Sequence, residues 1–126
     1  MRVLVVDDAR VMRIACERIL GTLGYADVAS ADRAANGLRA ARELRPDAVV
    51  VDGRLVECDV PAYVAQLRAV LPQAAILVIA AIDEVALVRA CVARGATGAL
   101  KRPLLRSDVA ARLQEAAAGT TAPGAS

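Results

Sequence analysis

The chain opens with the run VLVVDD at residues 3–8, and a second run, AVVVD, occupies residues 48–52. Each run is a short apolar stretch that does not alternate with polar residues and that ends in aspartate. Continuous apolar runs of this length are typical of strands buried on both faces, as in a parallel sheet covered by helices. The two runs therefore predict buried parallel strands whose carboxyl ends carry aspartates.

The rest of the chain repeats the order of strand followed by helix. Further strands are predicted at 27–31, 75–79 and 99–101, and helical periodicity fills the segments between strands. The predicted helices cover 10–23, the segment from Asp32 to Pro46, 61–70, the segment from Asp83 to Gly95, and a last segment that begins at Ser107, with Asp32, Asp83 and Ser107 as N-caps. Five such repeats predict an α/β domain of the doubly wound, flavodoxin-like (βα)5 type, with strand order 2-1-3-4-5.

Length and composition predict one domain over 1–118 and a flexible tail over 119–126, where Gly, Thr, Ala, Pro and Ser prevail. The sequence leaves open whether this domain stands alone or is followed by another. The N-terminus does not read as a signal peptide, and no apolar run reaches membrane-spanning length, so we expect a cytoplasmic protein.

Composition excludes several classes of function. The chain has no His, which removes His general bases, His metal ligands and Ser–His or Cys–His nucleophile pairs. It has no Trp or Phe, and a net charge of +2, so neither stacking on single-stranded nucleic acid nor charge-driven binding of nucleic acid is expected. The widely spaced Cys16, Cys58 and Cys91 form no CxxC pair and are expected to be free thiols.

Charged side chains follow three of the predicted strands. Asp7 and Asp8 follow the first, Asp52 ends the third, and Lys101 and Arg102 end the fifth. Since the carboxyl ends of parallel strands meet at one edge, we expect three carboxylates to converge there. Carboxylates this close require a cation or bound protons, and an all-oxygen site suits Mg²⁺. An aspartate beside Mg²⁺ can itself act as a nucleophile and form an acyl phosphate.

Over about residues 2–118 the sequence resembles the receiver domain of two-component response regulators, of the short chemotaxis type. The resemblance is carried by VLVVDD and the following ARVMR, by RPDAVVVD at 45–52 with Asp59 seven residues later, and by Gly95 and Ala96 leading to LKRP at 100–103. It implies that Asp52 is the phosphoacceptor, that a histidine kinase or phosphotransfer protein is the donor, and that the chain is a signalling module rather than an enzyme.

The resemblance also implies the surroundings of Asp52. Mg²⁺ would be held by Asp8, Asp52 and the backbone carbonyl of Arg54, with Asp7 bound through water. Backbone N–H groups at Ala81 and near Gly53 would contact the phosphoryl oxygens. Arg102 would take the place of the family's phosphate-binding lysine, before a Pro103 that often follows a cis peptide bond. An alternative register would bring Lys101 inward, but adjacent strand side chains point opposite ways.

The sequence departs from the family where the signal is normally read out. The switch Thr or Ser falls on Ala80, and the switch aromatic falls on Ala99. Alanine offers neither a hydroxyl for phosphate nor a ring that can move. Leu55 and Val56 replace the usual Met-Pro, and Val60 replaces a Gly, so the loop over 53–60 is expected to be rebuilt.

Two hypotheses follow. In the first, Asp52 is phosphorylated and the signal leaves by another route, through the loop around Arg54 or the helix that begins near Asp83. In the second, the chain is a degenerate receiver that binds a partner protein without phosphorylation. The downstream partner is unspecified, and a homodimer is compatible with both.

Two enzyme-like classes fit less well. A phosphohydrolase would need a second Asp where Arg54 stands, and a flavin or dinucleotide binder would need a Gly-rich first loop.

Overall fold

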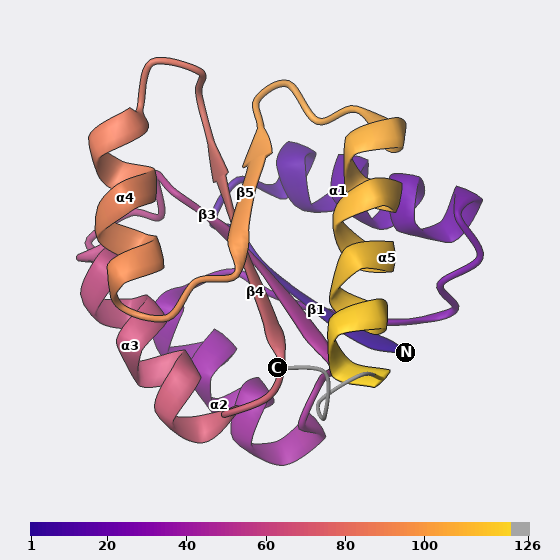
Figure 1. Cartoon of the computed structure of the whole chain (residues 1–126), viewed down its shortest axis with the longest axis horizontal. Helices are drawn as coiled ribbons and strands as arrows, with labels where there is room; N and C mark the ends of the chain where they lie inside the picture. The colour runs from indigo at the N-terminus through magenta and orange to yellow at the C-terminus, as the bar shows by residue number, and fades with distance from the viewer. Residues whose placement is uncertain (122–126) are drawn as a thin grey trace.

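The computed structural model describes residues 1–121, with side chains through residue 118. Five parallel strands form one sheet in the order β2-β1-β3-β4-β5, which confirms the predicted fold class (Figure 1). The strands are β1 (Arg2–Val6), β2 (Asp27–Ala31), β3 (Ala48–Asp52), β4 (Ala75–Ala80) and β5 (Gly98–Lys101). The helices are α1 (Arg10–Thr22), α2 (Ala34–Leu44), α3 (Val60–Val70), α4 (Val85–Ala93) and α5 (Arg106–Thr121).

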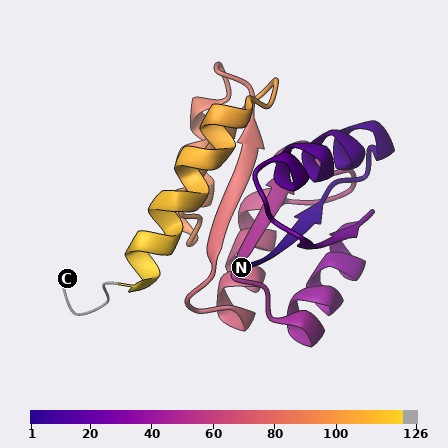
Figure 2. The same cartoon turned by 90° about the vertical axis from the view of Figure 1, so that its right-hand side faces the viewer.

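The sheet lies between two layers of helices. Helices α1 and α5 cover one face, where Cys16, Leu20, Val109 and Leu113 form a cluster with alternate residues of the central strands. Figure 2, which views the molecule from this side, shows both helices in front of the strands. Because successive side chains of a strand point to opposite faces, each central strand supplies both layers, as its unbroken apolar run predicts.

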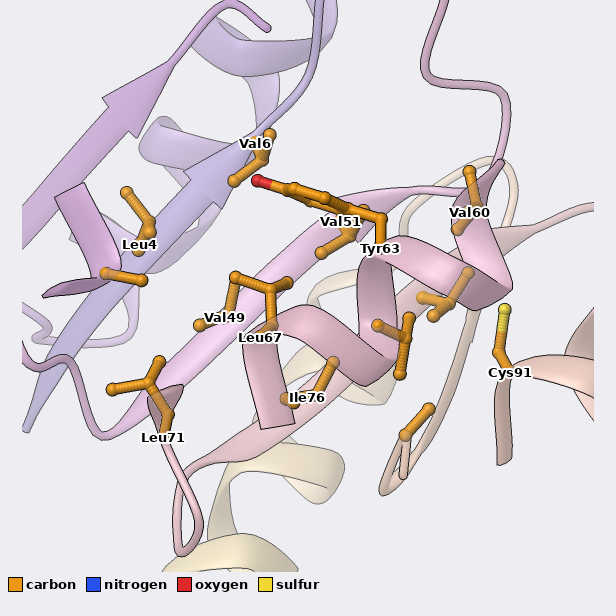
Figure 3. Close-up of a cluster of buried hydrophobic side chains, with 14 of the residues drawn as sticks. Leu4, Val6, Val49, Val51, Val60, Tyr63, Leu67, Leu71, Ile76 and Cys91 are labelled. Atoms are coloured by element: carbon orange, nitrogen blue, oxygen red, sulfur yellow. The ribbon is translucent and has the colours of Figure 1, made fainter. Parts of the chain in front are cut away.

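Helices α2, α3 and α4 cover the other face. Figure 3 shows Tyr63 and Leu67 of α3 lying over Val6, Val49 and Val51 of the sheet. The Tyr63 hydroxyl donates to the Ala34 carbonyl of α2 at 2.7 Å, so its polar end is satisfied although the residue is only 3% exposed. Burying each such large side chain stabilises the fold by roughly 1.5–3 kcal/mol.

The strand register brings the predicted charged residues to one level. Val6 pairs with Val51, so Asp7 and Asp52 follow at the same edge of β1 and β3. On the other side Asp52 pairs with Ile79. This edge, where the strands end, is called the carboxyl edge below.

Three predicted N-caps are wrong. Helix α2 begins at Ala34 after Arg33, and Asp32 instead accepts a hydrogen bond from the Asn36 amide at 3.0 Å. Helix α4 begins after Glu84 rather than Asp83. Ser107 lies inside the first turn of α5. At α2 and α4 the residue before the helix makes no side-chain hydrogen bond to the first turn, so no capping residue in the sequence marks these two starts.

Helix α3 differs because its cap is a side chain. Asp59 accepts from the Ala62 N–H at 3.2 Å, and Pro61 stands in the first turn, as a helix start favours.

At the other end of the chain, α5 continues to Thr121, past the boundary expected at 118. The remainder of the expected tail, 122–126, lies outside the described residues.

The opposite edge of the sheet, where the strands begin, is closed by Arg68 of α3. Its guanidinium donates to the backbone carbonyls of Gly95, Leu71 and Ala74 at 2.7–3.0 Å. Gly95 has a φ of +118°, and a Cβ there would lie 2.9 Å from Cγ of Arg68. Burial lowers the pKa of Arg68. We call this region the amino edge.

Within the described part of the chain, no helix is both long and apolar enough to cross a membrane.

Candidate functional site

Three carboxylates converge at the carboxyl edge. Asp7 and Asp8 follow β1 and Asp52 ends β3, and one carboxylate oxygen from each lies within 4.8 Å of the others. Asp7 and Asp52 are buried, with 1% and 5% of their surface exposed, whereas Asp8 is exposed. The three carboxylates that were expected to converge therefore lie together in the structure. The cluster is open to solvent on the side of Asp8.

Local hydrogen bonds fix the three aspartates in place. Asp7 Oδ1 accepts from the Ala9 N–H at 2.9 Å, and Asp52 Oδ1 accepts from the Arg54 N–H at 3.0 Å. Asp8 Oδ1 accepts from the Val56 N–H at 3.2 Å, which joins the first loop to the third. Asp7 and Asp52 thus order the loops that carry them, whereas Asp8 links its own loop to the loop after β3.

The electrostatics of the cluster favour binding of a cation. Burial, opposed by the Ala9 hydrogen bond and assisted by the charges of Asp52 and Asp8, raises the pKa of Asp7 to about 6. A buried carboxylate with a raised pKa is one whose negative charge is not fully compensated by its surroundings. A hard divalent cation would supply the missing compensation, and carboxylate and carbonyl oxygens are the donors that Mg²⁺ prefers. The residues present therefore fit this metal.

Arg102 reaches the cluster from β5. Its Nη2 donates to Asp52 Oδ1 at 2.5 Å, in an ion pair whose arginine side chain is 21% exposed. Lys101 is exposed, so Arg102 is the basic residue that faces the site. The Arg102–Pro103 peptide bond is cis. The Nε of Arg102 is buried and has no hydrogen-bond partner among the described residues.

A second set of contacts lies beside Asp52 and was not foreseen from the sequence. Glu84 Oε1 accepts from the Ala81 N–H at 2.8 Å and lies 3.5 Å from Nε of Arg54. Arg54 is largely exposed, yet it pairs with Glu84, a residue thirty positions away. Neither hydrophobic periodicity nor a short motif predicts a contact between residues so far apart in the sequence.

A family model described as the response regulator receiver domain matches residues 3–114. The chain belongs to this family. It is thus a receiver domain of the two-component systems, as the resemblance of its motifs predicts.

Relatives and solved structures agree with that placement. The chemotaxis protein CheY of Thermotoga maritima is 29% identical over 114 residues, which cover 90% of this chain and 95% of that one. The transcriptional regulatory protein PrrA of Mycobacterium tuberculosis is 35% identical over 113 residues, which are 90% of this chain and 48% of PrrA. A CheY-like receiver domain structure from Methanospirillum hungatei superposes with a TM-score of 0.86 at 18% identity, covering 95% of each chain.

This receiver has a small, mainly apolar cavity at Ala80 and Ala99, the two positions to which the resemblance assigns the switch residues. Ala80, at the end of β4, is buried, and Ala99 on β5 is half-buried. Together with Val85 and Val88 of α4 they line a cavity of about 200 Å³. Neither alanine can donate a hydrogen bond from its side chain, so any response of this region must use backbone or neighbouring groups.

The loop between β3 and α3 accommodates its unusual residues. Leu55 is buried, and Val60 begins α3 with no left-handed backbone. The left-handed residue of this loop is instead Glu57, with a φ of +53°. Gly53 remains necessary, because a Cβ there would lie 2.5 Å from the Ile79 carbonyl oxygen.

Proposed function

We propose that this receiver accepts a phosphoryl group on Asp52 from a histidine kinase or a phosphotransfer protein. The observation that carries the proposal is the convergence of Asp7, Asp8 and Asp52 with Arg102 bound to the last of them. In the reaction an Asp52 oxygen forms a bond to phosphorus while the bond from phosphorus to the donor imidazole nitrogen breaks. The imidazole leaves with its electron pair and takes up a proton, and Asp52 becomes an acyl phosphate.

The metal in this proposal is Mg²⁺, held by Asp8, Asp52 and the backbone carbonyl of Arg54, with Asp7 bound through water. When bound, it offsets negative charge on the carboxylates and on the transferred group. Asp7 and Asp52 bring two buried carboxylates to the same point, and the raised pKa of Asp7 supports a cation site there.

Other groups of the chain hold the phosphoryl oxygens. Arg102 is assigned to one oxygen, because its guanidinium already lies on Asp52. A second oxygen is assigned to the Ala81 N–H, which follows β4 at the carboxyl edge. These donors hold a group in place and orient it, so the chain works as a stoichiometric acceptor and not as a turnover enzyme.

One observation favours a second candidate. The Arg102–Asp52 ion pair supplies Asp52 with a cationic partner inside the chain, and Ala80 and Ala99 lack the usual means of read-out. A receiver of this kind can serve as a phosphorylation-independent binding module for another protein. In either case we expect a cytoplasmic signalling module with a protein as its output partner; a second copy of this chain would serve as one.

Intact mass after incubation with acetyl phosphate and Mg²⁺ tests the proposal. We expect a single phosphoryl adduct on the wild type, none on Asp52→Asn and none when Mg²⁺ is removed. Absence of the adduct, together with absence of Mg²⁺ binding at millimolar concentration, would contradict the proposal in favour of the binding module. Sustained hydrolysis of a generic phosphate ester would contradict both candidates.

A further inference from the structure

A chain of contacts leads from Asp52 to the start of α4 without passing through either switch position. Arg54 donates its backbone N–H to Asp52 Oδ1 at 3.0 Å, and its Nε lies 3.5 Å from Glu84 Oε1. The same Glu84 oxygen accepts the Ala81 N–H at 2.8 Å. The Glu84 carboxylate thus accepts a hydrogen bond from the end of β4 and forms an ion pair with the loop that carries Asp52.

These two donors are the kind that an anion on Asp52 would recruit. A guanidinium and a backbone N–H are both strong donors to phosphoryl oxygens. The backbone N–H of Arg54 donates to Asp52, so the Arg54 side chain begins beside the Asp52 carboxylate. Glu84 therefore occupies, with its carboxylate, donors that would otherwise be available to an anion bonded to Asp52.

From this we infer that Glu84 is an internal substitute for a phosphoryl oxygen, and that phosphorylation of Asp52 displaces it from the Ala81 N–H and from Arg54. The inference rests on the proposed function and specifies how the site is regulated. Two negative groups that compete for the same donors repel each other, and the site can keep only one of them. Arg54 then passes from Glu84 to the phosphoryl group.

Displacement of Glu84 changes the first turn of α4. Glu84 directly precedes α4, its N–H donates to the Ala81 carbonyl at 3.0 Å, and its carbonyl accepts from the Val88 N–H at 3.2 Å. The segment also carries two apolar side chains in water, Ile82 at 77% exposure and Val85 at 51%. A movement of this turn would therefore change a surface that a partner protein can contact. Such a movement needs neither a hydroxyl at Ala80 nor an aromatic ring at Ala99.

Binding of beryllofluoride, an unreactive mimic of the acyl phosphate, tests the inference in the presence of Mg²⁺. Fluorine NMR would measure its affinity for the wild type, for Glu84→Gln and for Glu84→Ala. Asp83→Asn is the matched control, since it removes the same charge one residue away. We expect both Glu84 variants to bind about five- to tenfold more tightly than the wild type, because the competing charge is gone. Asp83→Asn should bind within twofold of the wild type, within about 0.4 kcal/mol.

A second readout comes from the amide resonances. In the wild type, beryllofluoride should shift the Ala81 and Glu84 N–H signals, and in Glu84→Ala the Ala81 signal should already be displaced before the mimic is added. Equal affinity in all four proteins, or an Ala81 signal that does not respond, would overturn the inference while leaving the phosphoacceptor intact. Failure of every protein to bind beryllofluoride would overturn the proposed function, and the inference with it.

Discussion

The amino edge and the carboxyl edge of the sheet both hold charged groups that are partly buried. The two edges differ in how far these groups are paired within the fold. At the amino edge, the Arg68 guanidinium donates to three backbone carbonyls. Nearby, Asp47 accepts from the Arg2 N–H at 2.7 Å, and Arg2 itself pairs with Asp27. The hydrogen-bonding groups at this edge are thus partnered within the fold.

At the carboxyl edge the acids outnumber the base that reaches them. Three carboxylates meet here, those of Asp7, Asp8 and Asp52, and Arg102 is bound to Asp52. The pKa of Asp7 is raised to about 6. Such an arrangement lowers stability unless something else binds. The difference indicates that the amino edge contributes to folding, whereas the carboxyl edge retains unmatched charge for a ligand.

The largest expected effect concerns the amino edge. Arg68→Met should lower the free energy of unfolding by about 3 kcal/mol, because the carbonyls of Gly95, Leu71 and Ala74 lose a charged donor. Urea unfolding measures the loss, with Arg39→Met, an exposed arginine of α2, as the control. Phosphorylation by the folded fraction should be unchanged. An unchanged midpoint would remove the distinction between the two edges.

The next effect concerns the base at the carboxyl edge. Arg102→Met should slow phosphorylation by acetyl phosphate on the order of a hundredfold, because removing one electrostatic donor to the transferred group costs about that much. Lys101→Met is the matched control, since Lys101 is exposed beside it, and its rate should stay within twofold of the wild type, a change of about 0.4 kcal/mol. The reverse ranking would assign the phosphate contact to Lys101.

A third prediction reverses the usual effect of removing a buried polar group. Asp7→Asn keeps the Oδ1 that accepts from Ala9 but removes the charge, and should raise the free energy of unfolding at pH 7 by about 2 kcal/mol without Mg²⁺. A carboxyl whose folded pKa is raised to about 6, from 3.8, contributes stability below pH 3.8 that is lost as pH rises through 6. The gain of the variant should therefore vanish below pH 3.8. Loss of stability in the variant at pH 7 would show that Asp7 is already compensated.

The same proton governs metal binding. Because Asp7 has a pKa of about 6, a proton competes with Mg²⁺ below that pH, and the Mg²⁺ affinity should fall about tenfold between pH 7 and pH 5. Calorimetric titration at both values measures the change. Asp7→Asn should bind more weakly at pH 7 and lose most of the pH dependence. A wild-type affinity that is constant over this interval would exclude Asp7 from the metal site.

The smallest effect is expected in the cavity beside α4. Ala99→Tyr should fill part of the 200 Å³ space and raise the free energy of unfolding by at most about 1 kcal/mol. Its phosphorylation rate should match that of the wild type, because the proposed route runs through Glu84. Ala90→Tyr on the exposed side of α4 serves as the control for a surface ring. A large change in the phosphorylation rate of Ala99→Tyr would instead indicate that phosphorylation is read out through β5.

The fold and the acidic cluster were predictable because their signals are local. Continuous apolar runs identified the buried strands, and the position of Asp7, Asp8 and Asp52 at strand ends followed from the parallel topology. The sequence favoured Arg102 over Lys101 because Arg102 directly precedes Pro103 but left open which of the two faces the site, and in the structure Arg102 is the one that contacts Asp52.

What the sequence did not predict depends on how loops run. The helix starts near Asp32, Asp83 and Ser107 were misplaced, and no side-chain cap marks the actual start of α2 or α4. The pair of Arg54 and Glu84 joins two loops that only the folded sheet brings together, and Arg68 reads in the sequence as an ordinary basic residue of an amphipathic helix.

In the proposed function Asp52 accepts phosphate in a pocket where alanines stand at both switch positions. Borohydride reduces an acyl phosphate to an alcohol, so treatment after acetyl phosphate and Mg²⁺, followed by peptide mass spectrometry, locates the modified aspartate. We expect reduction at position 52 alone, dependent on Mg²⁺ and retained in Ala99→Tyr. Reduction at Asp7 or Asp8, or none at position 52 under conditions in which Mg²⁺ binds, would contradict the proposed function.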